Sequence, residues 1–247
     1  MQNNWLKERG IAHRGIIDSK NKIIENTIEA CENAIKLDMP IEIDIRITKE
    51  DELILLHDPY VTLSNNKTYT FKELTKKDIK QYKIINSNCK IPTLKEILDI
   101  VDGKVPLLIE AKVNKDYRNH KKLIRNIALL LNDYKGEYAI QSFHTNVYNI
   151  VKKVNNKAKI GLILPTTNKK TNYILNLINK IILKTKNYDF LSFGIKYIDD
   201  NMLNYLKTIK KPILLWTLKN ENKNKYVDAL NANIIINKDL NYLPKQN

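Results

Sequence analysis

Two histidines stand at the ends of short apolar runs, where their imidazole rings could transfer protons. His13 follows the run 10–12 (GIA), and His57 follows the run 52–56 (ELILL). Histidine is the side chain whose unperturbed pKa lies closest to neutral pH, so a pair of imidazoles can supply a general base and a general acid. The two positions therefore predict acid–base chemistry, provided that the fold brings the rings together.

Three carboxylates lie within other apolar runs. Glu42 and Asp44 belong to the run 40–46 (PIEIDIR), and Glu110 belongs to 105–111 (VPLLIEA). Side chains two positions apart on a strand point the same way, so Glu42 and Asp44 share a face. Buried acids at one place repel one another unless a cation lies among them, and carboxylate oxygens suit Mg²⁺, Ca²⁺ or Mn²⁺. The group predicts a divalent-cation site; the alternative is a surface strand whose charges face water.

Arg14 and Lys112 add two positive charges next to these residues. Two imidazoles, two cations and an acid-bound metal suit a phosphate ester, because the cations can bind its anionic oxygens while a base and an acid move protons. Gly15, directly after Arg14, allows the backbone to turn away or a ligand to approach closely.

Short apolar runs alternate with longer stretches of helical period along the chain. The expected strands are 10–13, 40–46, 52–57, 105–111, 138–142, 159–164, 189–193, 212–216 and 233–237. The expected helices lie near 26–38, 117–133, 145–154, 170–185, 199–210 and 221–231, with Thr145 and either Asp199 or Asp200 as candidate N-caps. Such alternation favours a parallel α/β sheet.

Either an open doubly wound sheet or a closed (β/α)8 TIM-type barrel fits this alternation. The barrel is favoured, because 40–46 and 52–57 can form one hairpin-like excursion and the chain of 247 residues matches the ~250 typical of that fold. The carboxyl ends of barrel strands meet at one face, where barrel enzymes hold their active sites. We expect a single barrel domain over 1–247, with residues 58–104 as a small insertion over the barrel mouth.

The composition limits the classes of binding partner that this protein is expected to have. The formal net charge is +15, which raises nucleic acid as a partner, but only five of the 42 basic residues are Arg, and the Lys residues are scattered. We interpret the charge mainly as a solvated surface, with no specific nucleic-acid partner and with weak attraction to anionic substrates or lipid left open.

The cysteines and the apolar runs indicate the cellular compartment in which the protein is expected. Cys31 and Cys89 lack the spacing of a disulfide framework or a thiolate zinc site. The longest apolar runs fall short of the ~20 residues that a transmembrane helix needs. The first ten residues lack the apolar stretch of a secretory signal. These features predict a cytoplasmic protein.

Several motifs occur together in a characteristic order. They are AHRG (12–15), ENT (25–27), IEIDIRITKEDELILLHD (41–58), IPTLKEILDIV (91–101) and LLIEAK (107–112), followed more weakly by AIQSF (139–143) and LLWTL (214–218). In this combination the sequence resembles the glycerophosphodiester phosphodiesterase family. The resemblance implies a TIM-type barrel with a small insertion after the second strand.

The resemblance also implies roles for the site residues. A divalent cation would be held by Glu42, Asp44 and Glu110, and imidazoles matching His13 and His57 would act as general base and general acid. Arg14 and Lys112 would hold the phosphate, while Phe143 and Trp216 are candidates to line the substrate pocket, with barrel packing as the alternative. The implied reaction is hydrolysis of glycerophosphodiesters to glycerol 3-phosphate and an alcohol through a cyclic phosphate.

The last expected strand departs from the family pattern. The run NANIIINKDL (231–240) has Asn237 where an Asp is often found, and the final helix is short or absent. The departure leaves open how the barrel closes. Two other functions also stay open: lysophospholipase D-like activity on lipid substrates, which would favour exposed apolar residues in the insertion, and a non-catalytic basic binding protein, which would favour clustered Lys and Arg.

Overall fold

The computed structural model describes residues 4–8, 10–113, 117–164, 187–218 and 225–242. Within them, eight parallel strands pair in the order β1-β11-β10-β9-β8-β7-β6-β2, and pairing of β1 with β2 closes the ring. The strands are β1 (Ile11–Ile17), β2 (Ile41–Ile47), β6 (Leu107–Ala111), β7 (Tyr138–Ser142), β8 (Lys159–Ile163), β9 (Phe190–Gly194), β10 (Ile213–Leu218) and β11 (Asn233–Asp239). The expected (β/α)8 TIM-type barrel is confirmed.

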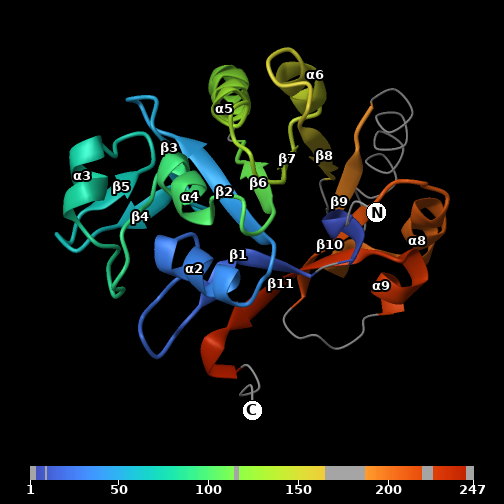
Figure 1. Cartoon of the computed structure of the whole chain (residues 1–247), viewed down its shortest axis with the longest axis horizontal. Coiled ribbons are helices and arrows are strands. Elements are labelled where there is room, and N and C mark those ends of the chain that lie inside the picture. The colour runs from blue at the N-terminus through green and yellow to red at the C-terminus, as the bar shows by residue number, and fades with distance from the viewer. Residues whose placement is uncertain (1–3, 9, 114–116, 165–186, 219–224, 243–247) are drawn as a thin grey trace.

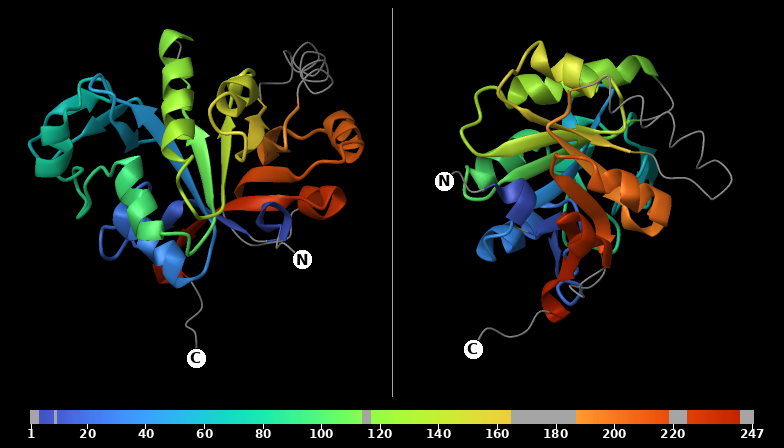
Figure 2. Two further views of the ribbon diagram at one scale, coloured as in Figure 1. Left: turned by 45° about the horizontal axis from the view of Figure 1, so that its top comes forward. Right: turned by 90° about the vertical axis from the view of Figure 1, so that its right-hand side faces the viewer.

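Helices surround this barrel (Figures 1 and 2). They are α2 (Ile28–Lys36), α4 (Leu94–Val101), α5 (Tyr117–Leu130), α6 (Val147–Lys152), α8 (Asp200–Lys207) and α9 (Lys225–Leu230), with short 3-10 turns η1 (Ile195–Tyr197) and η2 (Leu240–Tyr242). The expected helix at 170–185 lies outside the described residues. Asp199 caps α8, its Oδ1 accepting from the Met202 amide at 2.8 Å.

The predicted N-cap at Thr145 is wrong. Helix α6 begins after Asn146, whose own side chain makes no capping bond. The amide of Asn146 instead donates to Nδ1 of the buried His144 at 3.1 Å. The chain therefore enters this helix one residue later than the sequence predicts, because a histidine side chain accepts from the backbone of the turn.

An excursion follows the second barrel strand. Strand β3 (Leu53–Leu55) pairs antiparallel with β2, and beyond it lie β4 (Tyr60–Thr62), β5 (Thr68–Thr70) and α3 (Lys76–Gln81). These elements form a lobe at one side of the barrel (Figure 1, left) with an apolar cluster of its own that includes Leu63 and Phe71. The apolar face of α4 instead joins the main core, so this helix belongs to the layer around the barrel.

Apolar side chains fill the amino-terminal half of the barrel. Helix α1 (Trp5–Glu8) closes that end with Trp5 and Leu6, which pack in one cluster with Ile11, Phe190 and other inward-facing strand residues. A Cβ atom on Gly161 would collide with the Phe190 ring, so the ring can pack in this cluster only because position 161 has no side chain.

Strand β2 shows why the polar residues face the interior. Its isoleucines at 41, 43 and 45 pack in the layer between barrel and helices. Side chains on a strand alternate, so Glu42, Asp44 and Arg46 point to the opposite face, into the barrel. All three are buried. The alternating pattern IEIDIRI thus places buried charge at the carboxyl end of the barrel interior.

The last strand completes the barrel despite its unusual sequence. Strand β11 pairs in parallel with β10 and with β1, where Ile235 lies opposite Ile11 and Ile236 opposite Ala12. The apolar run at 234–236 therefore supplies the closing ladder, and closure does not require the family's usual residues here.

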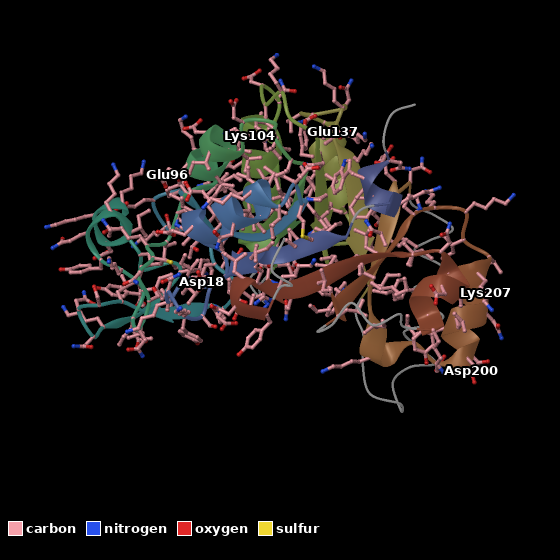
Figure 3. The ribbon with its side chains drawn as sticks, turned by 60° about the horizontal axis from the view of Figure 1, so that its bottom comes forward. Asp18, Glu96, Lys104, Glu137, Asp200 and Lys207 are labelled. Carbon is pink, nitrogen blue, oxygen red and sulfur yellow. The ribbon has the colours of Figure 1, made fainter. Side chains whose placement is uncertain are left out.

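Charged side chains point outward over many elements of the molecule (Figure 3). Lys104, Glu137, Asp200 and Lys207, which come from separate parts of the chain, are all exposed. Positive and negative groups are interspersed, as expected for a solvated surface. No helix among the described residues is long and apolar enough to cross a membrane.

Candidate active site

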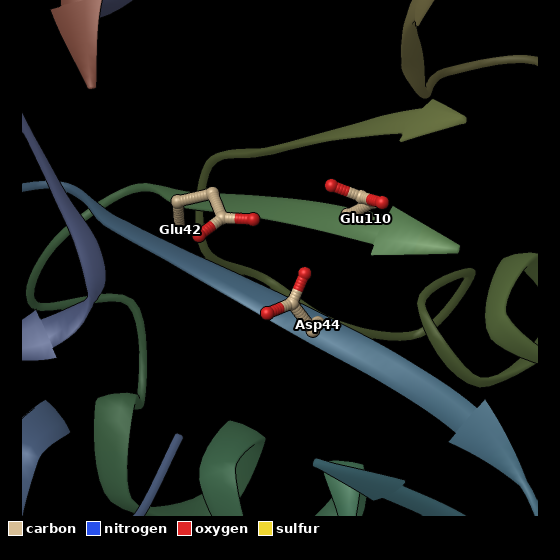
Figure 4. A group of neighbouring side chains, drawn as sticks. All are labelled: Glu42, Asp44 and Glu110. Carbon is tan, nitrogen blue, oxygen red and sulfur yellow. The ribbon is translucent and has the colours of Figure 1, made fainter. Parts of the chain in front are cut away.

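Three buried acids converge from two neighbouring strands (Figure 4). Glu42 and Asp44 lie on β2, Glu110 lies on β6, and Asp44 is the register partner of Glu110. Their exposed fractions are 2%, 1% and 8%. One carboxylate oxygen from each lies within 4.8 Å of the other two. The structure therefore brings together the acids that the sequence predicted as one group.

Two cations neutralise part of this charge. Lys112 Nζ lies 2.8 Å from Glu110 Oε1 and 3.2 Å from Asp44 Oδ1. Arg14 Nε lies 2.9 Å from Asp44 Oδ2, and its Nη1 lies 2.5 Å from Glu25 Oε1. Burial opposes both positive charges, but the neighbouring acids raise the pKa of Arg14 and of Lys112 above their ordinary values. Both side chains stay charged at neutral pH.

The acids differ in how readily they ionise. Burial, reinforced by Asp44 and Glu110, raises the pKa of Glu42 well above its ordinary value. Burial also raises the pKa of Glu110, against the opposing effect of Lys112. Asp44 is buried too, but Lys112 and Arg14 hold its pKa below the ordinary value. Asp44 is therefore the acid of the group that ionises most readily, and additional positive charge nearby would favour ionisation of Glu42.

The group fits a hard divalent cation. All three ligands offer carboxylate oxygens, the donor type that Mg²⁺, Ca²⁺ and Mn²⁺ prefer. Asp44 Oδ1 and Glu110 Oε1 are buried, and among the described residues the ammonium of Lys112 is the group that the structure pairs with both. The three acids also outnumber the two adjacent cations. An additional positive charge at this place would relieve the repulsion that raises the pKa of Glu42.

The two imidazoles flank the acids and cations. His13 Nδ1 lies 2.5 Å from Asn237 Oδ1, and its Nε2 lies 3.9 Å from Glu42 Oε2. His57 Nδ1 lies 2.7 Å from Asp58 Oδ1. Burial lowers the pKa of both histidines; Arg14 lowers that of His13 further, and Lys112 lowers that of His57. At neutral pH these shifts favour neutral rings, which can accept a proton.

A bulge in β1 directs Arg14 into the mouth. The register with β11 shifts between Ala12 and Ile16, Arg14 has φ +58°, and Gly15 has φ +83°. A Cβ atom on Gly15 would lie 2.7 Å from the Ala30 carbonyl carbon and oxygen, so a side chain cannot fit there. The glycine is required both by its left-handed backbone and by close packing against α2.

The site residues surround a pocket of about 190 Å³. From the sequence-predicted set, the lining contains His13, Arg14, Glu42, His57, Glu110, Lys112, Phe143 and Trp216. Asp44 lies beside it, in contact with Arg14 and Lys112. The two aromatic rings stand edge to face, with centroids 6.4 Å apart. Phe143 and Trp216 therefore form a pocket wall.

Sequence reasoning gave no site role to several residues that shape this pocket. Asn26 is buried and bonds Asp44 twice: its Nδ2 donates to Oδ2 at 2.9 Å, and its Oδ1 accepts from the Asp44 amide at 3.1 Å. Glu25 anchors Arg14, Asn237 contacts His13, and Gln141 lines the pocket. The motif ENT at 25–27 was the available signal for Glu25 and Asn26, but its position on a loop gave no direction for the side chains.

Buried acids, imidazoles and cations around one pocket at the carboxyl ends of a (β/α)8 barrel define a class of enzyme that cleaves phosphate esters. The sequence profile of the glycerophosphoryl diester phosphodiesterase family matches residues 13–239. The chain belongs to this family, and is accordingly a phosphoric diester hydrolase.

Individual relatives agree with this assignment. The chain is 30% identical over 170 residues to a glycerophosphodiester phosphodiesterase of Caldanaerobacter subterraneus subsp. tengcongensis, covering 64% of this chain and 67% of that protein. It is 27% identical over 144 residues to a lysophospholipase D of Rattus norvegicus, covering 53% of this chain and 43% of that protein.

The fold is similar to that of solved structures. An Oleispira antarctica phosphodiesterase, whose structure is in complex with its product sn-glycerol-3-phosphate, superimposes with a TM-score of 0.70. The match covers 94% of this chain and 92% of that one at 17% identity. At that identity the likeness supports the barrel fold.

Proposed function

We propose that this chain, acting as one barrel domain over residues 1–247, hydrolyses glycerophosphodiesters to glycerol 3-phosphate and an alcohol. The observation that carries the proposal is the convergence of three buried acids, two imidazoles and two cations on a single pocket. The relative from Caldanaerobacter bears the name of this activity, and the Oleispira enzyme binds glycerol 3-phosphate as its product.

A divalent cation, Mg²⁺ or Ca²⁺ with Mn²⁺ as a further candidate, would be held by Glu42, Asp44 and Glu110. When bound, such a cation supplies Lewis-acid stabilisation of the negative charge that develops on the phosphate. The support lies in the all-oxygen donor set, its burial and its excess of negative charge over Arg14 and Lys112.

Arg14 and Lys112 would bind the phosphate oxygens. The guanidinium has five N–H donors, and its contacts with Glu25 and Asp44 engage two of its nitrogens, so donors remain for an anion. The ammonium of Lys112 has three donors and contacts two carboxylates. Because both cations are fixed by acids before substrate arrives, little reorganisation is needed when charge develops in the transition state.

The imidazoles of His13 and His57 would move the protons. One ring takes the proton from the glycerol hydroxyl next to the diester, whose oxygen attacks phosphorus. The other ring, which would be protonated once the anionic diester lies beside it, gives this proton to the departing alcohol as its bond to phosphorus breaks, which leaves a cyclic phosphate. Water then opens the ring with the two imidazoles in reversed roles, so that diester plus water gives glycerol 3-phosphate plus alcohol.

The test is release of glycerol 3-phosphate from glycerophosphocholine by the purified chain, with and without a chelator. We expect turnover that stops on chelation and returns when Mg²⁺ or Ca²⁺ is restored. Lys112→Ala should lose activity, whereas Lys95→Ala, which removes an exposed ammonium paired with Asp99 on α4, should not. Full turnover in excess chelator would contradict the cation assignment, and no turnover under any metal condition would contradict the proposed substrate.

Lysophospholipase D-like activity is the second candidate, favoured by the similarity to the rat enzyme. The same chemistry would apply, with a lipid in place of the small diester. The pocket is lined mainly by charged and polar side chains, which suit a glycerol phosphate better than an acyl chain and favour the deacylated substrate. Comparing kcat/KM for lysophosphatidylcholine and glycerophosphocholine under one metal condition distinguishes the two.

A further inference from the structure

Arg46 is a buried cation that the proposed mechanism does not use. It lies on β2 two residues after Asp44, on the same inward face as Glu42, and is 5% exposed. A buried guanidinium is costly unless its N–H groups are bonded. Burial lowers the pKa of Arg46, but Asp44, Asp58 and Glu110 oppose this effect. The hydrogen bonds of its N–H groups offset the cost of burying this charge in the fold.

The guanidinium donates to backbone carbonyls beside His57. Arg46 Nε lies 3.1 Å from Leu56 O and 3.1 Å from His57 O, and its Nη2 also contacts His57 O. These residues follow β3, where the chain leaves the sheet, and the Leu56 amide donates to the Asp44 carbonyl at 3.0 Å. The segment that carries the imidazole is thus bonded to β2 by a backbone bond and by the fork of Arg46.

The excursion supports the same guanidinium from its other side. Arg46 Cζ lies 5.1 Å from the centroid of the Phe71 ring, a distance at which cation and ring attract. Phe71 is buried in the excursion's own apolar cluster together with Leu63 and Ile79. A single side chain therefore links three parts: the strand that bears the acids, the turn that bears His57, and the lobe outside the barrel.

We propose that Arg46 is a positioning residue that fixes the carbonyls of residues 56 and 57, and with them the place of the His57 imidazole, and that Phe71 holds the guanidinium in this orientation. The inference rests on the proposed function only in the role given to His57. A ring displaced by about 1 Å costs on the order of a hundredfold in rate, because proton transfer requires close alignment.

The test compares Arg46→Gln with the wild type in two independent measurements. In the diesterase assay we expect kcat to fall at least about tenfold with KM changed less than about threefold, because substrate-binding groups are untouched. In amide hydrogen exchange we expect faster exchange at residues 56–60, with unchanged exchange in β7 and β8. Lys72→Ala is the matched control, because it removes the other cation near the Phe71 ring, at 5.9 Å, and leaves the carbonyl contacts in place.

Two further variants keep the proposal testable if Arg46→Gln folds poorly. Phe71→Leu retains the guanidinium but removes the ring, and should give a smaller loss of kcat and a smaller rise in exchange at 56–60. In Arg46→Ala, millimolar guanidinium should partly restore kcat, whereas it should not restore His57→Ala. A folded Arg46→Gln with wild-type kcat and unchanged exchange at 56–60 would overturn the proposal. If the wild type lacks diesterase activity the proposed function fails, and the exchange data alone still decide the role of Arg46.

Discussion

The two halves of the barrel interior are both buried but are held in different ways. At the amino-terminal end, Trp5, Ile11, Phe190 and Leu214 form an apolar plug. At the carboxyl end, buried acids and cations face one pocket. Apolar burial stabilises a fold at about 25 cal/mol per Å², whereas buried charges that are imperfectly paired cost stability. The comparison indicates that the plug contributes stability and that the rim is maintained for chemistry.

The largest expected effect is at the rim. His13→Ala or His57→Ala should lower kcat by at least about a hundredfold, because each removes a proton-transfer group. Neither ring lies in the apolar plug, so the melting temperature should change little. Steady-state kinetics with glycerophosphocholine and thermal unfolding monitored by circular dichroism measure the two effects. A variant with near-wild-type kcat would remove that histidine from the mechanism.

Trp5→Ala tests the contribution to stability of the apolar plug at the amino-terminal end of the barrel. Removal of this buried ring should lower the free energy of unfolding by about 3–5 kcal/mol, the usual cost of a large cavity. The pocket residues are untouched, so kcat measured where the variant is still folded should stay within about twofold of the wild type. Denaturant unfolding and kinetics at low temperature provide the comparison. A large loss of kcat without loss of stability would show that the two halves are not separable.

Substitution of a buried residue usually lowers the free energy of unfolding, but Glu42→Gln should not lower it when no divalent cation is present. Without a divalent cation, the neutral amide relieves repulsion from Asp44 and Glu110, so the variant should be at least as stable as the wild type. With cation at about 100 times its Kd, the wild type should gain about 2.7 kcal/mol and the variant much less. Thermal unfolding with chelator and with Ca²⁺ or Mg²⁺ measures both. A variant that is destabilised in chelator and still stabilised by the cation would contradict the site.

The smallest effect concerns a thiol on the outer side of the barrel. Burial, with Glu32 and Glu29 acting in the same direction, raises the pKa of Cys31 to about 12, from an ordinary value of 9.0. Above pH 9 the unfolded chain loses this proton while the folded chain keeps it, so stability should fall as pH rises.

At pH 10 the wild type should have lost on the order of 1 kcal/mol of its free energy of unfolding through Cys31. Urea unfolding between pH 8 and pH 10 should show a shallower decline for Cys31→Ala than for the wild type, since the other titrating groups are common to both. Equal slopes would mean that the thiol is accessible to ionisation in the folded protein. Alkylation of the native protein at pH 8 should likewise be slow at Cys31.

The hydrophobic pattern of neighbouring residues was sufficient to predict the barrel and the faces of its strands. The alternation in 40–46 placed Glu42 and Asp44 on one face, and the order of strands and helices identified a barrel, because strand and helix periods are properties of neighbouring residues. The polar residues at strand ends were predicted to converge, because parallel strands all end at the same face. Residue type alone offered Asp199 or Asp200 as the cap of α8, and the structure selects Asp199. Thr145 was predicted from residue type in the same way, but the side chain that bonds the backbone of that turn is His144, which accepts from the Asn146 amide.

By itself the sequence determined the periodicity, the strand order expected of a barrel and the residue types at the rim. Only the tertiary structure decided which side chains meet: Asn237 reaches His13 across 224 positions, and Arg46 reaches the carbonyl of His57 from the neighbouring strand. The physical reason is that contacts of this kind depend on barrel closure, strand register and the β1 bulge, and these are set by packing of the whole chain rather than by any local run of residues.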